Sequence, residues 1–423
     1  MNIARRILLA FQRSARSPAT GRLLTPRRED SVRDYPGAGL TPRRLAAILK
    51  EADAGSLSTP MQLFEEMEEK DPHLYAVANS RRLGLTGLPW EIISAAELDD
   101  RADRVLAEEA AAHTREVLQR LEGFEESLQH LSLAIGRNLA VAEIVWEAVA
   151  GELRPVELVP VDFTRLVFDE WNRLRILTEE EPRAGIAPPP HKFIVHAPHS
   201  TTGHPQRGGL LRVTALVYLA KNLALKDWMI FAEIFGMPVR IARYEPSATE
   251  EEKRELLRML ETLGSHATGI FSRAVELQFI ESRRGSGGSP YQGLIEFLNR
   301  EMSKAWLGQT LTTDITGQSG SIAAARVHAD VRRDILLDDA RKESRTLRRD
   351  LLTPLTVLRF GSHAPVPLFR RKLKPAEDTA RLAEVLDTAV NRLGLAVPAA
   401  WVREALGLPA PGADADTLRG ATG

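Results

Sequence analysis

The sequence has 423 residues, 43% of them hydrophobic, so it can bury a sizeable core. The 56 lysines and arginines nearly balance the 57 aspartates and glutamates, which excludes the strong net positive field of a protein that grips nucleic acid by charge alone. The chain has no cysteine, which excludes disulfides and thiolate metal or redox centres.

The N-terminal 40 residues are basic and lack a sustained hydrophobic period. Residues 1–50 contain eleven Lys and Arg against three Asp and Glu. The apolar stretch near the start is too short for a secretory signal and lacks a clear cleavage site, whereas an organelle transit peptide is an alternative for such an Arg-rich start. We expect residues 1–40 to form a basic disordered arm, of the kind that contacts nucleic acid or acidic partners.

Residues 41–209 mix helical and strand patterns, which predicts an α+β module. Apolar residues recur at helical spacing over 42–52 and 59–84. The further expected elements are helices at 98–121 and 123–135 and strands at 88–94, 141–149, 152–160, within 163–177 and at 192–196. The expected core aromatics are Trp146, Phe168 and Trp171.

The segment 178–210 is rich in proline, glycine and histidine, which indicates a long surface connection. Four histidines raise the alternative of a metal site: His191, His196, His199 and His204. They lack helical i, i+4 spacing and a nearby cysteine, so we expect ordinary surface histidines.

Residues 210–235 contain no proline or glycine and are apolar over most of the helix circumference. This pattern predicts a helix of 26 residues, about 39 Å long, that is buried on several sides. Charged residues such as Lys221, Lys226 and Glu233 interrupt it too often for a lipid span. We therefore expect it to pack between neighbouring protein helices.

A β-α-β insert follows, with strands at 239–244 and 275–279 around a helix that Thr249 and Glu252 open as a capping box. The glycine-rich loop at 283–289 suggests a phosphate-binding loop as an alternative. It lacks the Gly-Lys-Ser/Thr sequence that such a loop needs, so this alternative is disfavoured.

Residues 291–307 predict a second long helix, 309–321 a polar loop and 322–352 a third, densely charged helix. The mixed charges of the third helix fit a solvated face with helical ion pairs and fit subunit contacts equally well. A strand and basic linker at 361–374 and two short helices at 375–407 follow, and the tail after them has a disordered composition.

The chain carries no catalytic motif that we recognise: no nucleophile elbow, no zinc-protease helix and no cysteine nucleophile. We therefore expect no enzyme activity, no cofactor and no metal. The first long helix is too apolar for the surface of a monomer, which implies an oligomer. A ring would bury its apolar sides against neighbouring copies and leave the polar loop facing an axis.

Over about residues 36–360 the chain resembles the Mu-like family of tailed-phage portal proteins. The matching segments are YPGAGLT (35–41), RLGLTGLPW (82–90), KFIVH (192–196), KDWMIFAEIFGMP (226–238) and LGQTLTT (307–313). The resemblance implies the portal fold, α+β and mainly helical. Its expected parts are a wing (41–209), stem helices (210–236 and 289–308), a clip (237–288), a tunnel loop (309–321), a long helix returning to the wing (322–374) and crown-like C-terminal helices with a disordered tail (375–423).

The resemblance also implies a ring, usually of about twelve subunits, at one vertex of the head of a tailed phage, prophage or gene-transfer-like particle. Double-stranded DNA would pass through it without sequence-specific recognition during packaging and ejection. The implied partners are the large terminase subunit, head-completion or connector proteins, and capsid and scaffold proteins, with no membrane. Assembly would take place in the host bacterial cytoplasm, before the ring becomes part of the virion.

These roles select particular residues. The expected stem interface comprises Leu216, Leu223, Trp228, Phe231 and Phe235. A channel needs hydroxyls and amides that let DNA slide, and the expected lining is Gln309, Thr310, Thr312, Thr313, Gln318 and Ser319. The expected clip docking residues are Arg283 and Arg284. Two alternatives stay open from sequence: a soluble DNA-processing enzyme and a membrane-surface protein.

Overall fold

The structure is a computed structural model. It describes residues 18–25, 34–99, 102–198, 203–235, 239–243, 247, 249–262, 276–280, 290–310, 322–373, 379–406 and 408. The chain divides into two compact units, Met1–Arg371 and Lys372–Gly423, and each is described by itself.

The first unit begins with three helices, α2 (Pro42–Asp53), α3 (Ser58–Lys70) and α4 (Pro72–Thr86). The prediction of one helix over 59–84 was wrong, because the chain breaks at Asp71. Pro72 has no N–H to continue α3, and the carboxylate of Asp71 caps α4 by accepting hydrogen bonds from the backbone N–H groups of His73 and Leu74, at 3.0 and 3.1 Å.

A three-stranded antiparallel sheet in the order β3-β2-β6 forms the centre of this unit: β2 is Ala140–Val149, β3 is Glu152–Pro160 and β6 is Phe193–His196. Three helices precede it, α5 (Arg104–Arg120), α6 (Phe124–Ser132) and α7 (Ala134–Arg137). Helix α6 packs on β2 and β3, and the fully buried Trp146 lies in the shared core. The expected β-strands at 141–149, 152–160 and 192–196 are confirmed.

Two smaller pairs of strands complete this region of the first unit, and we call it, together with α2 to α7 and the central sheet, the base. Strand β1 (Trp90–Ile93) pairs with β9 (Leu368–Arg371), and β4 (Leu166–Phe168) pairs with β5 (Leu174–Ile176). The expectation that Trp171 belongs to the core was wrong: it lies between β4 and β5 with 64% of its surface exposed.

The histidine segment also differs from the expectation at one position. His196 is buried at the end of β6, and its Nδ1 lies 2.9 Å from the hydroxyl of Thr346. Among the described residues, no group of His, Cys, Asp or Glu could hold a metal ion. His199 lies outside the described residues.

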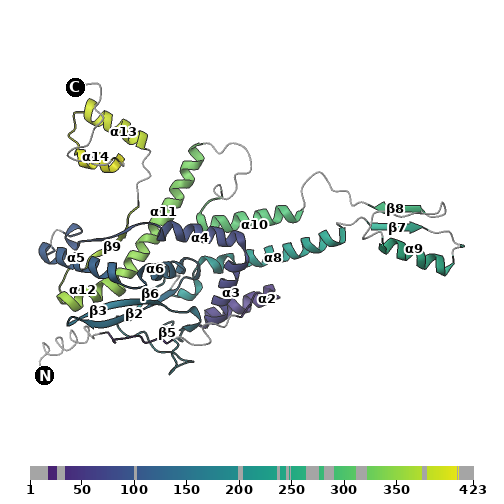
Figure 1. The fold of residues 1–423 in the computed structure, drawn as a ribbon, viewed down its shortest axis with the longest axis horizontal. Coiled ribbons are helices and arrows are strands. Elements are labelled where there is room, and N and C mark those ends of the chain that lie inside the picture. Colours follow the sequence, from purple (N-terminus) through teal and green to yellow (C-terminus); the bar gives the residue numbers. More distant parts are fainter. Residues whose placement is uncertain are drawn as a thin grey trace. The chain divides into compact units, whose positions relative to one another are not determined.

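The two long helices are α8 (Leu210–Phe235) and α10 (Pro290–Leu307). They contact each other and extend side by side away from the central sheet (Figure 1). Between them in the chain lie β7 (Val239–Arg243), α9 (Glu250–Thr262) and β8 (Glu276–Ile280), where β7 and β8 pair antiparallel and α9 contacts β7. The bounds of α8 are those expected from the sequence.

The charged third helix is interrupted near its C-terminal end. Helix α11 (Ile322–Leu347) passes through a π-helical turn, Arg348–Leu352, into α12 (Thr353–Phe360). In that turn Asp350 accepts a hydrogen bond from the backbone N–H of Val195 and Arg349 donates one to its carbonyl, at 2.9 and 2.7 Å. The turn thus satisfies backbone groups at the free edge of β6.

The second unit contains α13 (Thr379–Asp387), a π-helical turn at Thr388–Arg392 and α14 (Ala399–Leu406). The two helices contact each other. The two short helices expected at 375–407 are confirmed.

Candidate subunit interface on the long helices

An ion pair holds the N-terminal half of α8 in the base. The Nζ of Lys221 lies 2.7 Å from Oδ1 of Asp71, and both side chains are almost fully buried. The same carboxylate caps α4, so one aspartate fixes the start of α4 and the middle of α8 together. A buried pair of this kind is a fixed point because each charge depends on its partner for solvation.

Helix α4 also fastens α10 and α11. His73 Nε2 lies 2.8 Å from the hydroxyl of Ser303 on α10. The guanidinium of Arg81 donates to both carboxylate oxygens of Asp339 on α11, at 2.8 and 3.0 Å, and to the carbonyl of Trp306 on α10, at 2.9 Å. Together with the pair between Lys221 and Asp71, these contacts fix the positions of α8, α10 and α11 relative to one another.

Helix α8 has a buried side and an exposed side. Its N-terminal half buries Leu211, Ala215 and Leu219 inside the chain. Large apolar side chains are exposed along the rest of its surface, and they are Val213, Leu216, Leu223, Leu225, Met229, Ile230 and Phe231. Met229 has 73% of its surface in water. An apolar surface of this extent is typical of a binding face.

The partner helix α10 has the same character near its N-terminal end. Leu294 and Phe297 are exposed one turn apart, whereas Met302 and Trp306 are fully buried in the base. The rings of Phe231 on α8 and Tyr291 on α10 lie 5.8 Å apart. The two helices thus contact each other and still leave apolar side chains uncovered on both.

The expected interface residues fall largely on this surface. Leu216, Leu223 and Phe231 are exposed, with Leu216 at 64%, and Trp228 is half-buried. The side chain of Phe235 lies outside the described part of the chain. Their assignment to a subunit interface stays a prediction, which the exposure of these side chains makes physically reasonable.

The expected channel residues are described only at the start of the loop. Gln309 is buried, with 3% exposed, and Thr310 is half-buried. Gly308 just before them lies against Val331 and Ile335 of α11. Gln309 is therefore packed within the chain rather than presented on its surface. The positions outside the described residues are Thr312, Thr313, Gln318, Ser319, Arg283 and Arg284.

Helix α8 is also long and apolar enough to cross a membrane, judged by length and composition. The core helices of soluble proteins share this property. The buried pair between Lys221 and Asp71 places the middle of α8 inside the protein fold. Protein neighbours are therefore the simpler covering for its exposed side chains.

Sequence reasoning missed the groups that fix this surface in place. Arg81 and Asp339 are 258 positions apart, and Asp71 and Lys221 are 150 apart, so no local pattern connects them. One signal was available: an aspartate directly before a proline, as at Asp71, is a typical helix start.

Comparison with known proteins adds independent information. The chain matches the family described as "Portal protein of Mu bacteriophage" over residues 61–408. It is 31% identical over 385 residues to the Mu-like prophage FluMu protein gp29 of Haemophilus influenzae, covering 89% of this chain and 72% of that protein. It is 30% identical over 389 residues to the portal protein of Escherichia phage Mu, covering 90% and 74% of the two chains.

Among solved structures, a chain from the virion of a native gene transfer agent particle has a similar fold. The TM-score is 0.56 at 13% identity, and the match covers 87% of this chain and 94% of the other. A likeness at this identity concerns the fold, and it agrees with the expected α+β, mainly helical portal architecture. From the family match and the two relatives, we conclude that this chain belongs to the family of Mu-like bacteriophage portal proteins.

Proposed function

We propose that copies of this chain assemble head to tail into a ring in which α8 and α10 of each subunit pack against those of the next. The observation that carries this proposal is the uncovered apolar surface of the two helices. Val213, Leu216, Leu223 and Ile230 recur at intervals of three and seven residues, which places them along one side of α8. Full burial of each such side chain contributes about 1.5–3 kcal/mol.

The ring would serve as the portal at one head vertex of a phage or phage-like particle, in keeping with the family. Double-stranded DNA would pass along its axis during packaging and ejection. The polar loop at 309–321 is the proposed channel lining, with Gln309 supporting its base. A near-neutral chain suits this role, because each phosphate contact adds to the force that holds DNA in place.

Docking surfaces complete the proposal. The segment 237–288 would act as a clip that meets the large terminase subunit during packaging and connector proteins afterwards, with Arg283 and Arg284 in contact. The α+β base would act as the wing that meets capsid and scaffold proteins. Assembly would take place in the bacterial cytoplasm, and nothing in the role requires catalysis or a cofactor.

Negative-stain electron microscopy of the purified chain, together with its mass by light scattering, tests the ring. We expect particles with an open axial channel and a mass near twelve times the 46.8 kDa chain. A compact monomer at high protein concentration and at the salt used for capsid assembly would contradict the proposal. Binding of that monomer to lipid vesicles would instead support a membrane role for α8.

A further inference from the structure

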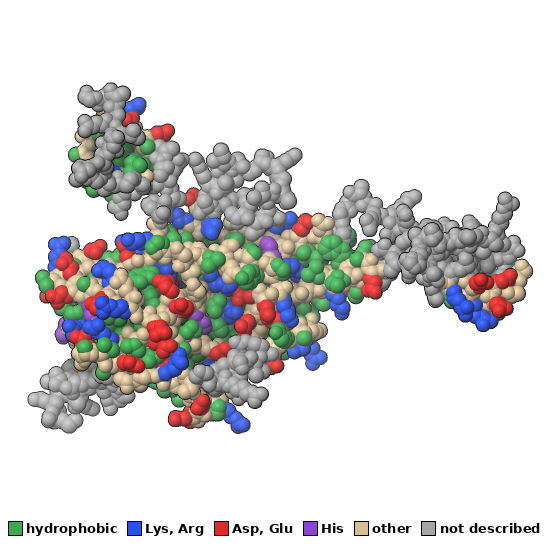
Figure 2. Space-filling view, in the orientation of Figure 1, with side chains coloured by type: hydrophobic (Ala, Val, Ile, Leu, Met, Phe, Trp, Pro, Cys, Tyr) green, Lys and Arg blue, Asp and Glu red, His purple; other side chains and the backbone are tan. Residues whose placement is uncertain are grey.

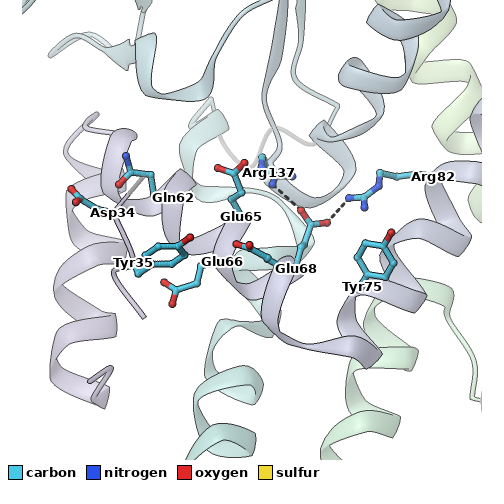
Figure 3. Close-up of a pocket in the computed structure, with 10 residues that line it drawn as sticks. Asp34, Tyr35, Gln62, Glu65, Glu66, Glu68, Tyr75, Arg82 and Arg137 are labelled. Atoms are coloured by element: carbon cyan, nitrogen blue, oxygen red, sulfur yellow. Dashed lines mark hydrogen bonds and ion pairs between the residues drawn. The ribbon is translucent and has the colours of Figure 1, made fainter. Parts of the chain in front are cut away.

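A groove outside the long helices has the composition of a site for basic peptides. It encloses about 430 Å³ and lies between the loop around Tyr35, helices α3 and α4, and the end of α7. Five carboxylates line it against two guanidiniums, and two tyrosines stand beside them (Figure 3). The lining residues that carry the argument are Asp34, Tyr35, Glu65, Glu69, Tyr75 and Arg137.

The floor of the groove is already neutralised. Glu68 bridges Arg82 and Arg137, with 2.8 Å to the latter (Figure 3). Burial by itself would raise the pKa of Glu68, but the charges and hydrogen bonds of Arg137 and Arg82 outweigh it and hold the pKa below the usual value. Glu66 accepts hydrogen bonds from Lys70 and from the backbone N–H of Gly37, both at 2.6 Å.

The rim of the groove carries three further carboxylates whose side chains are exposed. Glu65 and Glu69 are exposed one turn apart on α3, and Asp34 is exposed across from them. Tyr35 and Tyr75 are each more than half exposed. The ring of Tyr35 already holds a cation, because Nζ of Lys70 lies 4.4 Å from its centre. Carboxylates beside aromatic faces are the groups that bind arginine side chains.

A second observation also points to a ligand. The side chain of Arg137 is 5% exposed, yet its Nε and Nη1 atoms have no acceptor among the described residues. Buried donors of this kind are rare because each one costs free energy until it is paired. The guanidinium lies over the ring of Phe163, with its carbon 5.0 Å from the ring centre, so a peptide carbonyl in the groove would pair with these donors after the side chain turns toward it. A free metal ion or a lone ammonium would supply no acceptor.

The chain itself contains a segment of matching chemistry. Residues 1–17 contain Arg5, Arg6, Arg13 and Arg16 and no aspartate or glutamate. The strap that follows, residues 18–25, is fixed to the central sheet: the N–H of Gly21 donates to the carbonyl of Trp146 at 2.9 Å, and the N–H of Leu24 donates to Glu143 at 3.0 Å. From this anchor, 17 extended residues reach about 55 Å.

The position of the groove favours a neighbouring copy as the source. Helix α3 packs on α8, and the charge of Glu66 contributes to raising the pKa of Tyr218 on α8, after burial. The groove therefore adjoins the helix whose exposed side chains Val213 and Leu216 we assign to the ring contact. We propose that this groove binds the arginine-rich arm, residues 1–17, of the adjacent subunit and so links each copy to the next. This inference rests on the proposed ring.

Limited proteolysis of the assembled protein tests the docking. Trypsin cleaves after Arg13 and Arg16, and mass spectrometry follows the release of the arm. We expect Glu65→Gln with Glu69→Gln to accelerate this cleavage about tenfold, because the rim loses the charges that hold the arginines. The matched control, Glu108→Gln with Glu109→Gln on the exposed face of α5, should cleave at the wild-type rate.

The absence of cysteine allows a second test that identifies the source of the arm. With Arg13→Cys and Glu69→Cys in one chain, oxidation should yield a ladder of cross-linked subunits on a non-reducing gel. A disulfide confined to single chains would overturn the assignment to a neighbour. The control pair, Arg13→Cys with Glu109→Cys, should yield no ladder.

The outcomes separate this inference from the ring itself. If light scattering shows no ring, the proposed function fails. If rings form but the groove variants cleave at the wild-type rate, the ring stands and the groove proposal is wrong. Slower cleavage upon addition of duplex DNA, with no effect of the groove variants, would likewise overturn it and make the arm a nucleic-acid ligand.

Discussion

The two halves of α8 are both apolar, but the N-terminal half is buried on one side and the C-terminal half is largely exposed. The N-terminal half buries Leu211, Ala215 and Leu219 inside its own chain, and even its charged Lys221 is buried beside Asp71. Val213 and Leu216, on the other side of this half, are exposed. The C-terminal half exposes Leu223, Met229 and Ile230, and its charged Lys226 and Asp227 are in water. Figure 2 shows hydrophobic side chains gathered on the surface where the long helices extend from the central sheet. Apolar composition indicates that a surface is covered, and the fold shows whether the same chain covers it.

The comparison also separates two sources of stability. The base is held by long-range contacts such as those of Arg81 with Asp339 and of Arg371 with Glu343. In the C-terminal half of α8, the ring of Phe231 contacts that of Tyr291, and few long-range ion pairs are found there among the described residues. We therefore expect damage to the C-terminal half to remove assembly while the base remains folded, and damage to the base to lower its folding stability.

The largest effect should come from charge on the exposed stripe. Leu223→Glu with Ile230→Glu would place two carboxylates in the proposed contact, and the mass should fall about twelvefold, from ring to single subunit. The circular dichroism spectrum should keep its helical content, because neither side chain is buried in the chain. Val105→Glu, on the exposed face of α5, is the matched control and should leave the mass unchanged. Intact rings in the double variant would exclude this stripe as the interface.

The second largest effect concerns the buried ion pair in the middle of α8. Lys221→Met would leave Asp71 buried without its cation and should lower the free energy of unfolding by about 3–5 kcal/mol. The urea unfolding curve should be measured in the Leu223→Glu, Ile230→Glu background, so that subunit dissociation does not enter. Adding Asp71→Asn should restore most of the loss, because the amide oxygen still caps α4. No recovery in the double variant would mean that the pair itself is not the source of the effect.

Acid should affect the base through His130. Burial, together with the charge of Arg137, lowers the pKa of this histidine to about 4 from its ordinary 6.5. Its folded form is therefore neutral, whereas the unfolded chain takes up a proton as the pH falls below 6.5. Folding stability should fall between pH 6.5 and 4, by up to about 3 kcal/mol from this group. The difference between wild type and His130→Gln across that range isolates it, and parallel curves would contradict the assignment.

Local sequence patterns predicted many of the helices and strands. They did not predict the long-range ion pairs that hold the helices together. The bounds of α8 follow from a run without proline or glycine between Gly209 and Gly236, and those of β3 from Gly151 before it and Pro160 at its end; both were predicted from sequence. Trp171 was assigned to the core because an aromatic residue near a strand is usually buried, but it lies in the turn between β4 and β5 with 64% of its surface exposed. The pairing of Arg81 with Asp339 depends on the complete packing of α4, α10 and α11, which no local pattern contains.

The smallest expected effect is on hydrogen exchange after removal of a helix cap. We compare the cap of α9 with that of α2, a helix of the base. Thr249 and Glu252 cap α9 reciprocally: Oγ1 of Thr249 accepts from the N–H of Glu252 at 3.3 Å, and the Glu252 carboxylate accepts from the N–H of Thr249 at 2.7 Å. Thr41 caps α2 in the base, accepting from the N–H of Arg44 at 3.2 Å.

Helix α2 buries Leu45 and Ile48, whereas α9 shows Leu257 to water, so α9 depends more on its cap. Hydrogen exchange measured by mass spectrometry should therefore become about fivefold faster in α9 after Thr249→Ala. In α2, Thr41→Ala should change the exchange rate by less than about twofold, because tertiary packing holds the helix closed. Equal acceleration in both helices would contradict this expectation. It would mean that tertiary packing protects α2 no more than it protects α9.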